Sequence, residues 1–253
     1  MRVDVHVHTN KHSGCAVSSP EEMVRAAIAA GLDAIVLTEH DYMWEKDELG
    51  KLQKGFPGIM IFSGIEVSLD PAEHMVVIGA PDARPFFPGM KPADLAAAVR
   101  ACQGAAILAH PFRWAPTVRR DILDACPDAI EIGSNSIRNY MAEPIKALQQ
   151  RLKLPSLACS DGHHTEQLGL YAIDLWQPAQ DAQDLAGMIR RGEYEIWTNP
   201  RRIAQENLKL EAKIKVLHRL LAEGHTPDEA LWAAGLSRSL SYAVKKGFDL
   251  LFP

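Results

Sequence analysis

Histidines and carboxylates that could bind metal recur along the sequence. The amino-terminal stretch DVHVHT alternates valine with polar residues. Successive side chains of a strand point to opposite faces, so Asp4, His6 and His8 are expected on one face and the three valines on the other. Two imidazoles on one strand face commonly present two ligands to one metal ion. This spacing therefore predicts a metal site at the end of the first strand, with the valine face packed against helices.

Similar residues fall at the ends of later apolar segments. In parallel barrels the carboxyl ends of the strands form one rim, where side chains distant in sequence converge. Imidazoles and carboxylates gathered there would repel one another or waste hydrogen bonds unless a divalent cation organised them. The sequence thus predicts a metal-binding rim that draws on Glu39, His40, Glu66, His74, His110, Asp161 and His163.

Each of these positions also has a structural interpretation. A lone histidine at a strand end is more often a hydrogen-bonded residue than a ligand, which applies to His218 and His225 near the end of the chain. Glu66 could instead pair with an arginine, and His110 could simply end a strand. His164 is adjacent to a candidate ligand, points elsewhere and receives no role.

The segments between these residues predict an α/β fold. A helix is expected from Ser19 as N-cap, through Pro20, to Gly31. Repeated strand-then-helix units imply a parallel sheet, and a chain of 253 residues favours one closed or distorted barrel over two small domains. Strands are expected at 2–8, 33–40, 58–69, 74–80, 105–111, 128–134 and 154–164, and helices at 19–32, 92–104, 117–126 and 137–152.

Composition excludes several classes of protein. The net charge of −5 gives no global attraction to nucleic acid or anionic membranes. Met1 is followed at once by a strand pattern, and no apolar run approaches the roughly 20 residues that span a bilayer. The four cysteines lack a CxxC pair or the density of a disulfide scaffold, which fits a reducing compartment. A cytoplasmic protein without a membrane partner is therefore expected.

The motifs DVHVHT, LTEHD, SGIE, AHP and SDGHH, with a histidine shortly after SGIE, occur in this order. They resemble the motifs of the PHP (polymerase and histidinol phosphatase) superfamily of metal-dependent phosphoesterases. The resemblance covers about residues 2–165. It implies a distorted seven-stranded, TIM-like (βα)7 barrel with two or three divalent metal ions, variously zinc, manganese or iron. We expect this barrel to occupy residues 1–199, followed by a helical extension over residues 200–253.

Carried over by position, the resemblance implies up to three metal sites. The ligands would be His6, His8, Glu66 and Asp161 for the first metal, Glu66, His74 and His110 for the second, and His40 and His163 for the third. The family's third site normally takes one more aspartate or histidine after the HxHT motif, where this sequence has NKHSGCA. Alignment places Cys15 there, but His12 is slightly preferred because an exposed thiolate ligand is chemically fragile. An empty third site is the remaining alternative.

The implied chemistry is hydrolysis of a phosphate ester by water. Divalent cations polarise the ester and lower the pKa of water, so no protein nucleophile is needed. Glu66 would bridge two metals, and His40 or His163 could assist proton transfer if the third site is empty. Arg113 and Arg138 are candidates to bind phosphate, with an ordinary surface arginine as the alternative for each.

The segment after residue 200 lies outside the resemblance. It has helical spacing, and SRSLSYAVKK follows a turn as in a helix-turn-helix DNA reader. Its basic residues are interleaved with acids, so a tail packed on the barrel or on a sister subunit is the preferred interpretation. The function hypotheses are therefore a phosphoesterase acting on a phosphorylated metabolite, nucleotide or oligonucleotide, a DNA-binding regulator, and a barrel with purely structural metal.

Overall fold

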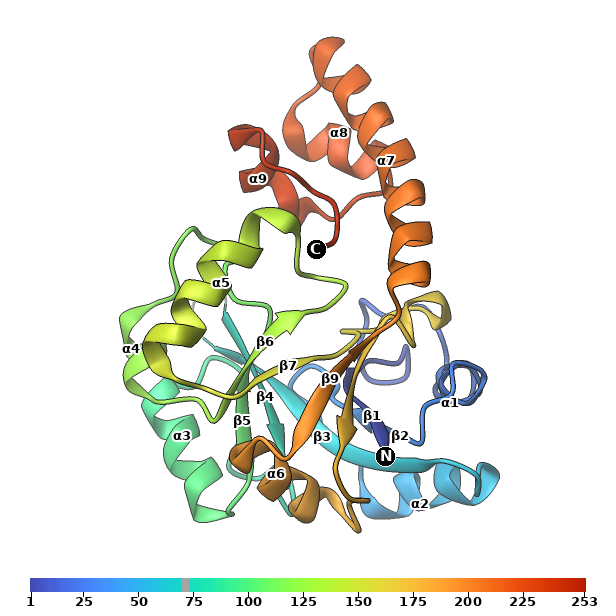
Figure 1. Ribbon diagram of the computed structural model, residues 1–253, viewed down its shortest axis with the longest axis vertical. Helices are drawn as coiled ribbons and strands as arrows, with labels where there is room; N and C mark the ends of the chain where they lie inside the picture. The colour runs from blue at the N-terminus through green and yellow to red at the C-terminus, as the bar shows by residue number, and fades with distance from the viewer. Residues whose placement is uncertain (70–72) are drawn as a thin grey trace.

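The computed structural model describes residues 1–69 and 73–253, and its main feature is a nine-stranded sheet rolled into a nearly closed barrel (Figure 1). Hydrogen-bonded neighbours follow the order β7-β6-β5-β4-β3-β2-β1-β8-β9, and β7 contacts β8 and β9 across the remaining gap. The strands are β1 (Arg2–Val7), β2 (Ala34–Leu37), β3 (Met60–Leu69), β4 (Glu73–Ile78), β5 (Ala105–Leu108), β6 (Ala129–Gly133), β7 (Ser156–Ala158), β8 (Tyr171–Leu175) and β9 (Tyr194–Thr198).

The sheet is mixed rather than wholly parallel, which corrects the expectation from sequence. β1, β2 and β3 run parallel, as do β5, β6 and β7, but β4 is antiparallel to β3 and β5, and β8 is antiparallel to β1 and β9. The direct succession of β3 and β4 explains this, because only antiparallel neighbours can be joined by a short connection. As a result, the first residues of β4 lie at the same rim as the last residues of β3.

Apart from the direct succession of β3 and β4, helices alternate with strands from β1 to β7. The predicted N-cap is confirmed, because Ser19 and Glu22 form a reciprocal capping box at the start of α1. The helices are α1 (Pro20–Ala29), α2 (Lys46–Gly55), α3 (Pro92–Ala101), α4 (Arg120–Asp124), α5 (Asn139–Leu152), α6 (Ala182–Arg191), α7 (Pro200–Ala222), α8 (Pro227–Ala233) and α9 (Ser241–Lys246), with 3-10 turns η1 (Thr165–Gln167) and η2 (Arg238–Leu240).

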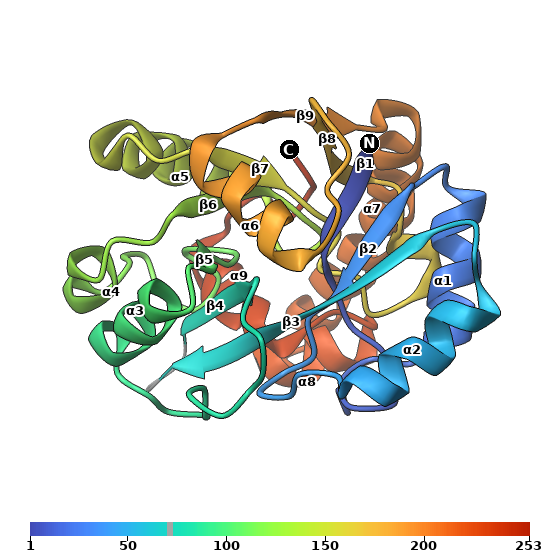
Figure 2. The same ribbon diagram turned by 90° about the horizontal axis from the view of Figure 1, so that it is seen from below.

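Apolar side chains fill the barrel below its site. Helix α6 lies across the lower opening in Figure 2, and its Leu185 and Ile189 join the buried cluster of the barrel interior. Val3 and Val5 belong to this cluster, whereas Val7 packs in another one with α1. The three valines therefore do not share one face as expected, because the register of β1 against β2 shifts between Asp4 and Val7.

Helices α7, α8 and α9 form a separate layer above the barrel rim (Figure 1). They share a small apolar cluster that includes Leu217, Leu231 and Leu240. Helix α7 begins two residues after β9 ends. The division into a barrel of residues 1–199 and an extension of residues 200–253 stays a prediction. Among the described residues, no helix combines the length and apolarity needed to cross a membrane.

Gly64 provides a test of how tightly β3 is held. A Cβ atom at Gly64 would lie 2.8 Å from the Val77 carbonyl oxygen and 3.1 Å from Thr38 Cγ2. We therefore expect Gly64→Ala to lower the free energy of unfolding by about 1–3 kcal/mol, the usual cost of overpacking. Gly58→Ala is the control, because nothing lies within 4 Å of a Cβ there. Equal denaturant midpoints for the two variants would contradict this account.

Candidate metal centre

Four buried side chains from three parts of the chain converge at the barrel rim. His6 Nε2 and His8 Nε2 are 2.9 Å apart. Glu66 Oε2 lies 3.3 Å and 3.2 Å from these two nitrogens, and Asp161 Oδ1 lies 3.5 Å and 3.3 Å from them. Ile65 and Val67 pack in the apolar cluster outside the barrel, so the alternation of β3 turns Glu66 inward. His6, His8 and Asp161 form a group that could hold one cation, and Glu66 Oε2 lies beside both histidines of that group.

Neighbouring acceptors set which nitrogen of each imidazole carries a proton. Glu131 Oε1 lies 2.6 Å from His6 Nδ1 and can only accept, so His6 Nδ1 is the donor. The Ser13 hydroxyl donates to Glu39 at 2.6 Å, so it accepts from His8 Nδ1 at 3.3 Å. In the neutral form of each histidine, Nε2 is therefore left with a lone pair directed at the shared position.

The donor set fits a divalent metal ion. Two Nε2 lone pairs at 2.9 Å repel each other unless a proton or a cation lies between them. Glu66 Oε2 and Asp161 Oδ1 are buried, and within the described part of the chain neither has a hydrogen-bond partner. Buried carboxylate oxygens are rarely left unpaired, because the desolvation cost is high. A cation bound by all four side chains would satisfy these oxygens and both lone pairs.

A second group of ligands shares the other oxygen of Glu66. Glu66 Oε1 lies 2.8 Å from His74 Nδ1 and 3.0 Å from His110 Nε2. His74 reaches this point because antiparallel β4 begins at the rim. His110 and Asp161 have positive φ angles of 26° and 49°. Such backbone conformations are strained for non-glycine residues, and they concentrate at functional sites.

A third group lies beside the first. The ring nitrogens of His8, His40 and His163 are close enough to hold one ion, and His40 Nδ1 also lies 3.0 Å from Glu66 Oε2. The imidazoles of His163 and His40 act on the Cys15 thiol and lower its pKa. His12 lies elsewhere, because its Nε2 is 3.0 Å from Glu48 Oε1 and its ring stacks on Tyr42. Cys15, rather than His12, is thus the loop residue that interacts with this group, and the choice of metal ligand between the two stays a prediction.

The charges of this centre depend strongly on one another. Burial alone would raise the pKa of Glu66, but the facing imidazoles of His6 and His74 hold that pKa well below its usual range. Burial likewise acts against the charged form of His40, yet the neighbouring Cys15 thiol and Glu66 carboxylate raise the pKa of His40 to about 10. Burial would also raise the pKa of Cys15, but His163 and His40 lower it to about 5. The carboxylates and thiol are therefore anionic and demand positive charge from their neighbours.

Sequence reasoning missed two residues that orient the ligands. Glu131 accepts from His6 and also from the His110 backbone N–H, at 2.8 Å. Ser136 donates a short hydrogen bond to Asp161 Oδ2. A signal existed for Glu131, since a lone carboxylate stands between two isoleucines in the strand AIEIG. No pattern singles out Ser136, which reaches Asp161 only through the fold.

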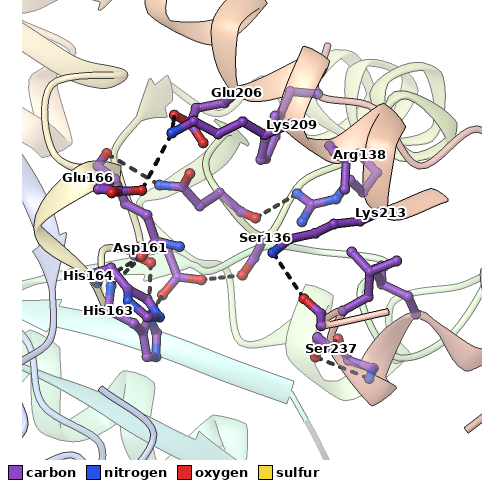
Figure 3. Close-up of a pocket in the computed structure, with 18 of the residues that line it drawn as sticks. Ser136, Arg138, Asp161, His163, His164, Glu166, Glu206, Lys209, Lys213 and Ser237 are labelled. Carbon is purple, nitrogen blue, oxygen red and sulfur yellow. Dashed lines mark hydrogen bonds and ion pairs between the residues drawn. The ribbon is translucent and has the colours of Figure 1, made fainter. Parts of the chain in front are cut away.

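The two candidate arginines, Arg113 and Arg138, line a cavity next to the centre, and Figure 3 shows Arg138 in it. Arg113 Nη1 lies 3.6 Å from Asp161 Oδ2, and its guanidinium packs against the Trp114 ring. Arg138 donates to the carbonyl oxygens of Asn135 and Ile137, at 2.6 Å and 3.1 Å. The alternative of an ordinary surface arginine does not describe Arg138, whose Nε is buried without a hydrogen-bond partner among the described residues.

A family model for the PHP domain matches residues 4–217. The chain belongs to the PHP domain family. This match covers most of the sequence and contains every residue of the candidate metal centre, and it confirms the resemblance based on the strand-end motifs. The chain is also similar to an uncharacterized protein of Methanocaldococcus jannaschii, MJ1587, with 26% identity over 169 residues that cover 62% of this chain and 96% of that protein.

Two solved structures illustrate how the PHP fold occurs in larger proteins. A two-domain protein from Bacteroides vulgatus, containing a predicted PHP-like metal-dependent phosphoesterase, aligns with a TM-score of 0.61 and 17% identity, over 79% of this PHP chain and 65% of that one. Endonuclease Q, in complex with a 27-mer duplex carrying an abasic lesion, aligns with a TM-score of 0.53 and 15% identity, over 75% and 56% of the two chains. These likenesses show a shared fold, and this PHP chain spans less than two thirds of either protein.

The geometry predicts that this PHP protein binds more than one divalent ion per chain. We expect elemental analysis after reconstitution with zinc, manganese or iron to give more than one equivalent, because one ion cannot engage all three ligand groups. At a metal concentration 100 times the dissociation constant, binding to the folded state adds about 2.7 kcal/mol of stability, or roughly 5–10 °C in melting temperature. One equivalent or none after reconstitution would contradict the multinuclear centre.

Proposed function

We propose that this protein is a metal-dependent phosphoric ester hydrolase acting on a phosphorylated small molecule, nucleotide or oligonucleotide. The observation that carries this proposal is the convergence of two imidazoles and two carboxylates at the barrel rim. His6 Nε2 and His8 Nε2 are 2.9 Å apart, and each of them lies 3.5 Å or less from both Glu66 Oε2 and Asp161 Oδ1. The PHP family assignment supports hydrolysis, and the likeness to endonuclease Q, which binds duplex DNA, supports a phosphodiester among the possible substrates.

Divalent ions in this centre would polarise the phosphate ester and supply an activated water at neutral pH. Glu66, with one oxygen toward each of two ligand groups, fixes the separation of those groups. Arg113 lies beside Asp161, where it can bind a phosphate oxygen of the substrate. His40 and His163 stand at the more open side of the centre, where either can donate a proton to the leaving oxygen if no third ion engages them.

A purely structural metal site does not explain this arrangement as well. Structural sites are closed around one ion, whereas here several ligand groups share Glu66 and adjoin a cavity. The DNA-binding regulator is also less well supported. Ser237 and Ser239, at the start of the proposed DNA-reading segment, line the cavity beside the metal centre, so this part of the segment adjoins the candidate site.

Glu66→Gln tests the proposed function. We expect a loss of hydrolysis of about 100-fold or more, because the amide keeps the shape of Glu66 but not the charge that two ligand groups share, and even the outer partners of metal ligands are worth roughly 10–100-fold. The measurement is turnover of phenyl phosphate, nucleotides and sugar phosphates by the metal-loaded variant. Glu48→Gln is the control, since Glu48 pairs with Lys11 and His12 outside the centre. Wild-type turnover by a folded, metal-loaded Glu66→Gln variant would exclude this role.

We also propose Cys15, rather than His12, as a ligand of the third group. The imidazoles of His163 and His40 lower the pKa of the Cys15 thiol, whereas His12 pairs with Glu48. Elemental analysis should therefore show Cys15→Ser losing up to one equivalent of metal while His12→Ala keeps the full complement. A thiolate ligand favours zinc or iron over manganese, so the loss should be clearest with those metals. Metal loss in His12→Ala alone would reverse the assignment.

A further inference from the structure

The cavity beside the metal centre has a second wall that comes from outside the barrel. Its volume is about 450 Å³, within the range of small-molecule sites. The barrel contributes Arg113, Asp161 and His163 to one side. Helix α7 contributes Lys209 and Lys213 to the other, as Figure 3 shows. The carboxy-terminal helices therefore help to form the space that a substrate of the metal centre would occupy.

This second wall is fastened to the barrel on one side of the cavity through the start of α7. The Arg202 guanidinium donates to the carbonyl oxygens of Leu168 and Glu166, at 2.5 Å and 2.8 Å. The Asn199 backbone N–H donates to the Leu170 carbonyl oxygen at 2.9 Å. These contacts hold α7 against the segment that directly follows His163.

The end of the chain is fastened on the opposite side. The Asn139 backbone N–H donates to the Leu251 carbonyl oxygen at 2.8 Å, and the Asn139 side chain donates to Asp249 at 2.7 Å. The Phe252 ring packs over the Arg138 guanidinium at 4.3 Å. The extension is thus tied to the barrel on both sides, so its wall is a preformed part of the cavity. Preformed walls reduce the entropy cost of binding.

Two cations that line the cavity have no carboxylate partner among the residues that the structure describes. Lys209 is neutralised, because Glu206 and Glu166 lie 2.7 Å and 3.5 Å from its Nζ. Lys213 Nζ donates only to the Gly235 carbonyl oxygen, at 3.1 Å, and no acidic side chain of the described residues pairs with it. Arg138 likewise donates only to carbonyl oxygens. Uncompensated cations facing a shared cavity are a characteristic of anion-binding sites.

We infer that the substrate is a small phosphomonoester with a second anionic group at its other end, and that Arg138 and Lys213 bind this second group. The inference rests on the proposed function, which places the scissile phosphate at the metal centre beside Arg113. The second group is a phosphate or a carboxylate, since both accept the hydrogen bonds that a guanidinium and an ammonium donate. Lys213 is then a specificity-determining residue contributed by the extension. Because the carboxy-terminal helices form one wall of the cavity, its volume of about 450 Å³ favours a small molecule over a polynucleotide.

Binding of non-hydrolysable ligands tests this inference separately from catalysis. The probes are α,ω-alkane bisphosphonates of increasing chain length and the matching monophosphonates, titrated calorimetrically into the metal-loaded, full-length protein. The best bisphosphonate should bind about 10-fold more tightly than its monophosphonate, since a hydrogen bond to a charged group contributes roughly 1.5–3 kcal/mol. Lys213→Gln should remove most of this difference and leave monophosphonate binding unchanged. Lys215→Gln, an exposed lysine of the same helix outside the cavity lining, should change neither.

Several outcomes would overturn the inference. Equal affinity for both classes of probe, or equal effects of Lys213→Gln and Lys215→Gln, would remove the second anion site. Tighter binding of a single-stranded oligonucleotide than of any bisphosphonate would replace the small molecule with a polynucleotide. Turnover of phenyl phosphate by the same preparation tests the proposed function. Turnover without bisphosphonate preference would overturn only the inference, whereas preference without turnover of any phosphomonoester or phosphodiester would overturn the proposed function.

Discussion

Two imidazole lone pairs and two carboxylate oxygens converge on one position at the rim of this barrel. His6 and His8 direct Nε2 there because the Nδ1–H of each ring donates to a buried acceptor. The acceptor is the Glu131 carboxylate for His6 and the Ser13 hydroxyl, which itself donates to Glu39, for His8. Glu66 and Asp161 add oxygens that have no hydrogen-bond partner among the described residues. Without a cation, this arrangement places four electron-rich atoms together in a desolvated site. The demand for positive charge at this point explains much of the surrounding structure.

The topology of the sheet supplies the ligands of this centre. β1 provides the histidine pair, β3 turns Glu66 inward between Ile65 and Val67, and antiparallel β4 brings His74 to the same rim. His110 and Asp161 reach the centre only with left-handed backbone angles. Such strain costs of order 1–3 kcal/mol per residue, and it persists where the surrounding structure fixes the conformation. The apolar interior and helix α6 below the rim provide that rigid support.

The carboxy-terminal helices change the character of the site. Residues 200–253 contain nine lysines and arginines against six aspartates and glutamates, although the whole chain has a net charge of −5. A basic layer therefore covers the rim of an acidic barrel, and part of its positive charge faces the cavity. Two lysines of this layer differ in whether their charge is already paired. Lys209 forms ion pairs with Glu206 and Glu166, whereas Lys213 has no such pair among the described residues and can interact with an anion in the cavity. This layer adds a substrate-facing surface that the barrel alone lacks.

The sequence by itself determined the class of fold and most of the candidate ligands. Alternation in DVHVHT, a lone glutamate in an apolar strand, and acidic or histidine residues at strand ends are local patterns, so they can be recognised without knowing how the strands pair. The capping of α1 by Ser19 is equally local. These features depend on neighbours a few residues away, and the periodicity of a strand or helix reports them directly.

Only the tertiary structure decided what depends on long-range pairing. The antiparallel direction of β4 and β8, the register shift in β1 and the closure by β9 follow from strand partners distant in sequence. His12 and Cys15 are three residues apart in one loop, and only the folded chain shows that Glu48 pairs with the first while His163 and His40 lower the pKa of the second. The same holds for Lys213, which meets the cavity only because hydrogen bonds at both ends fasten the extension over the barrel. No local pattern encodes these contacts, because each joins residues that the sequence keeps apart.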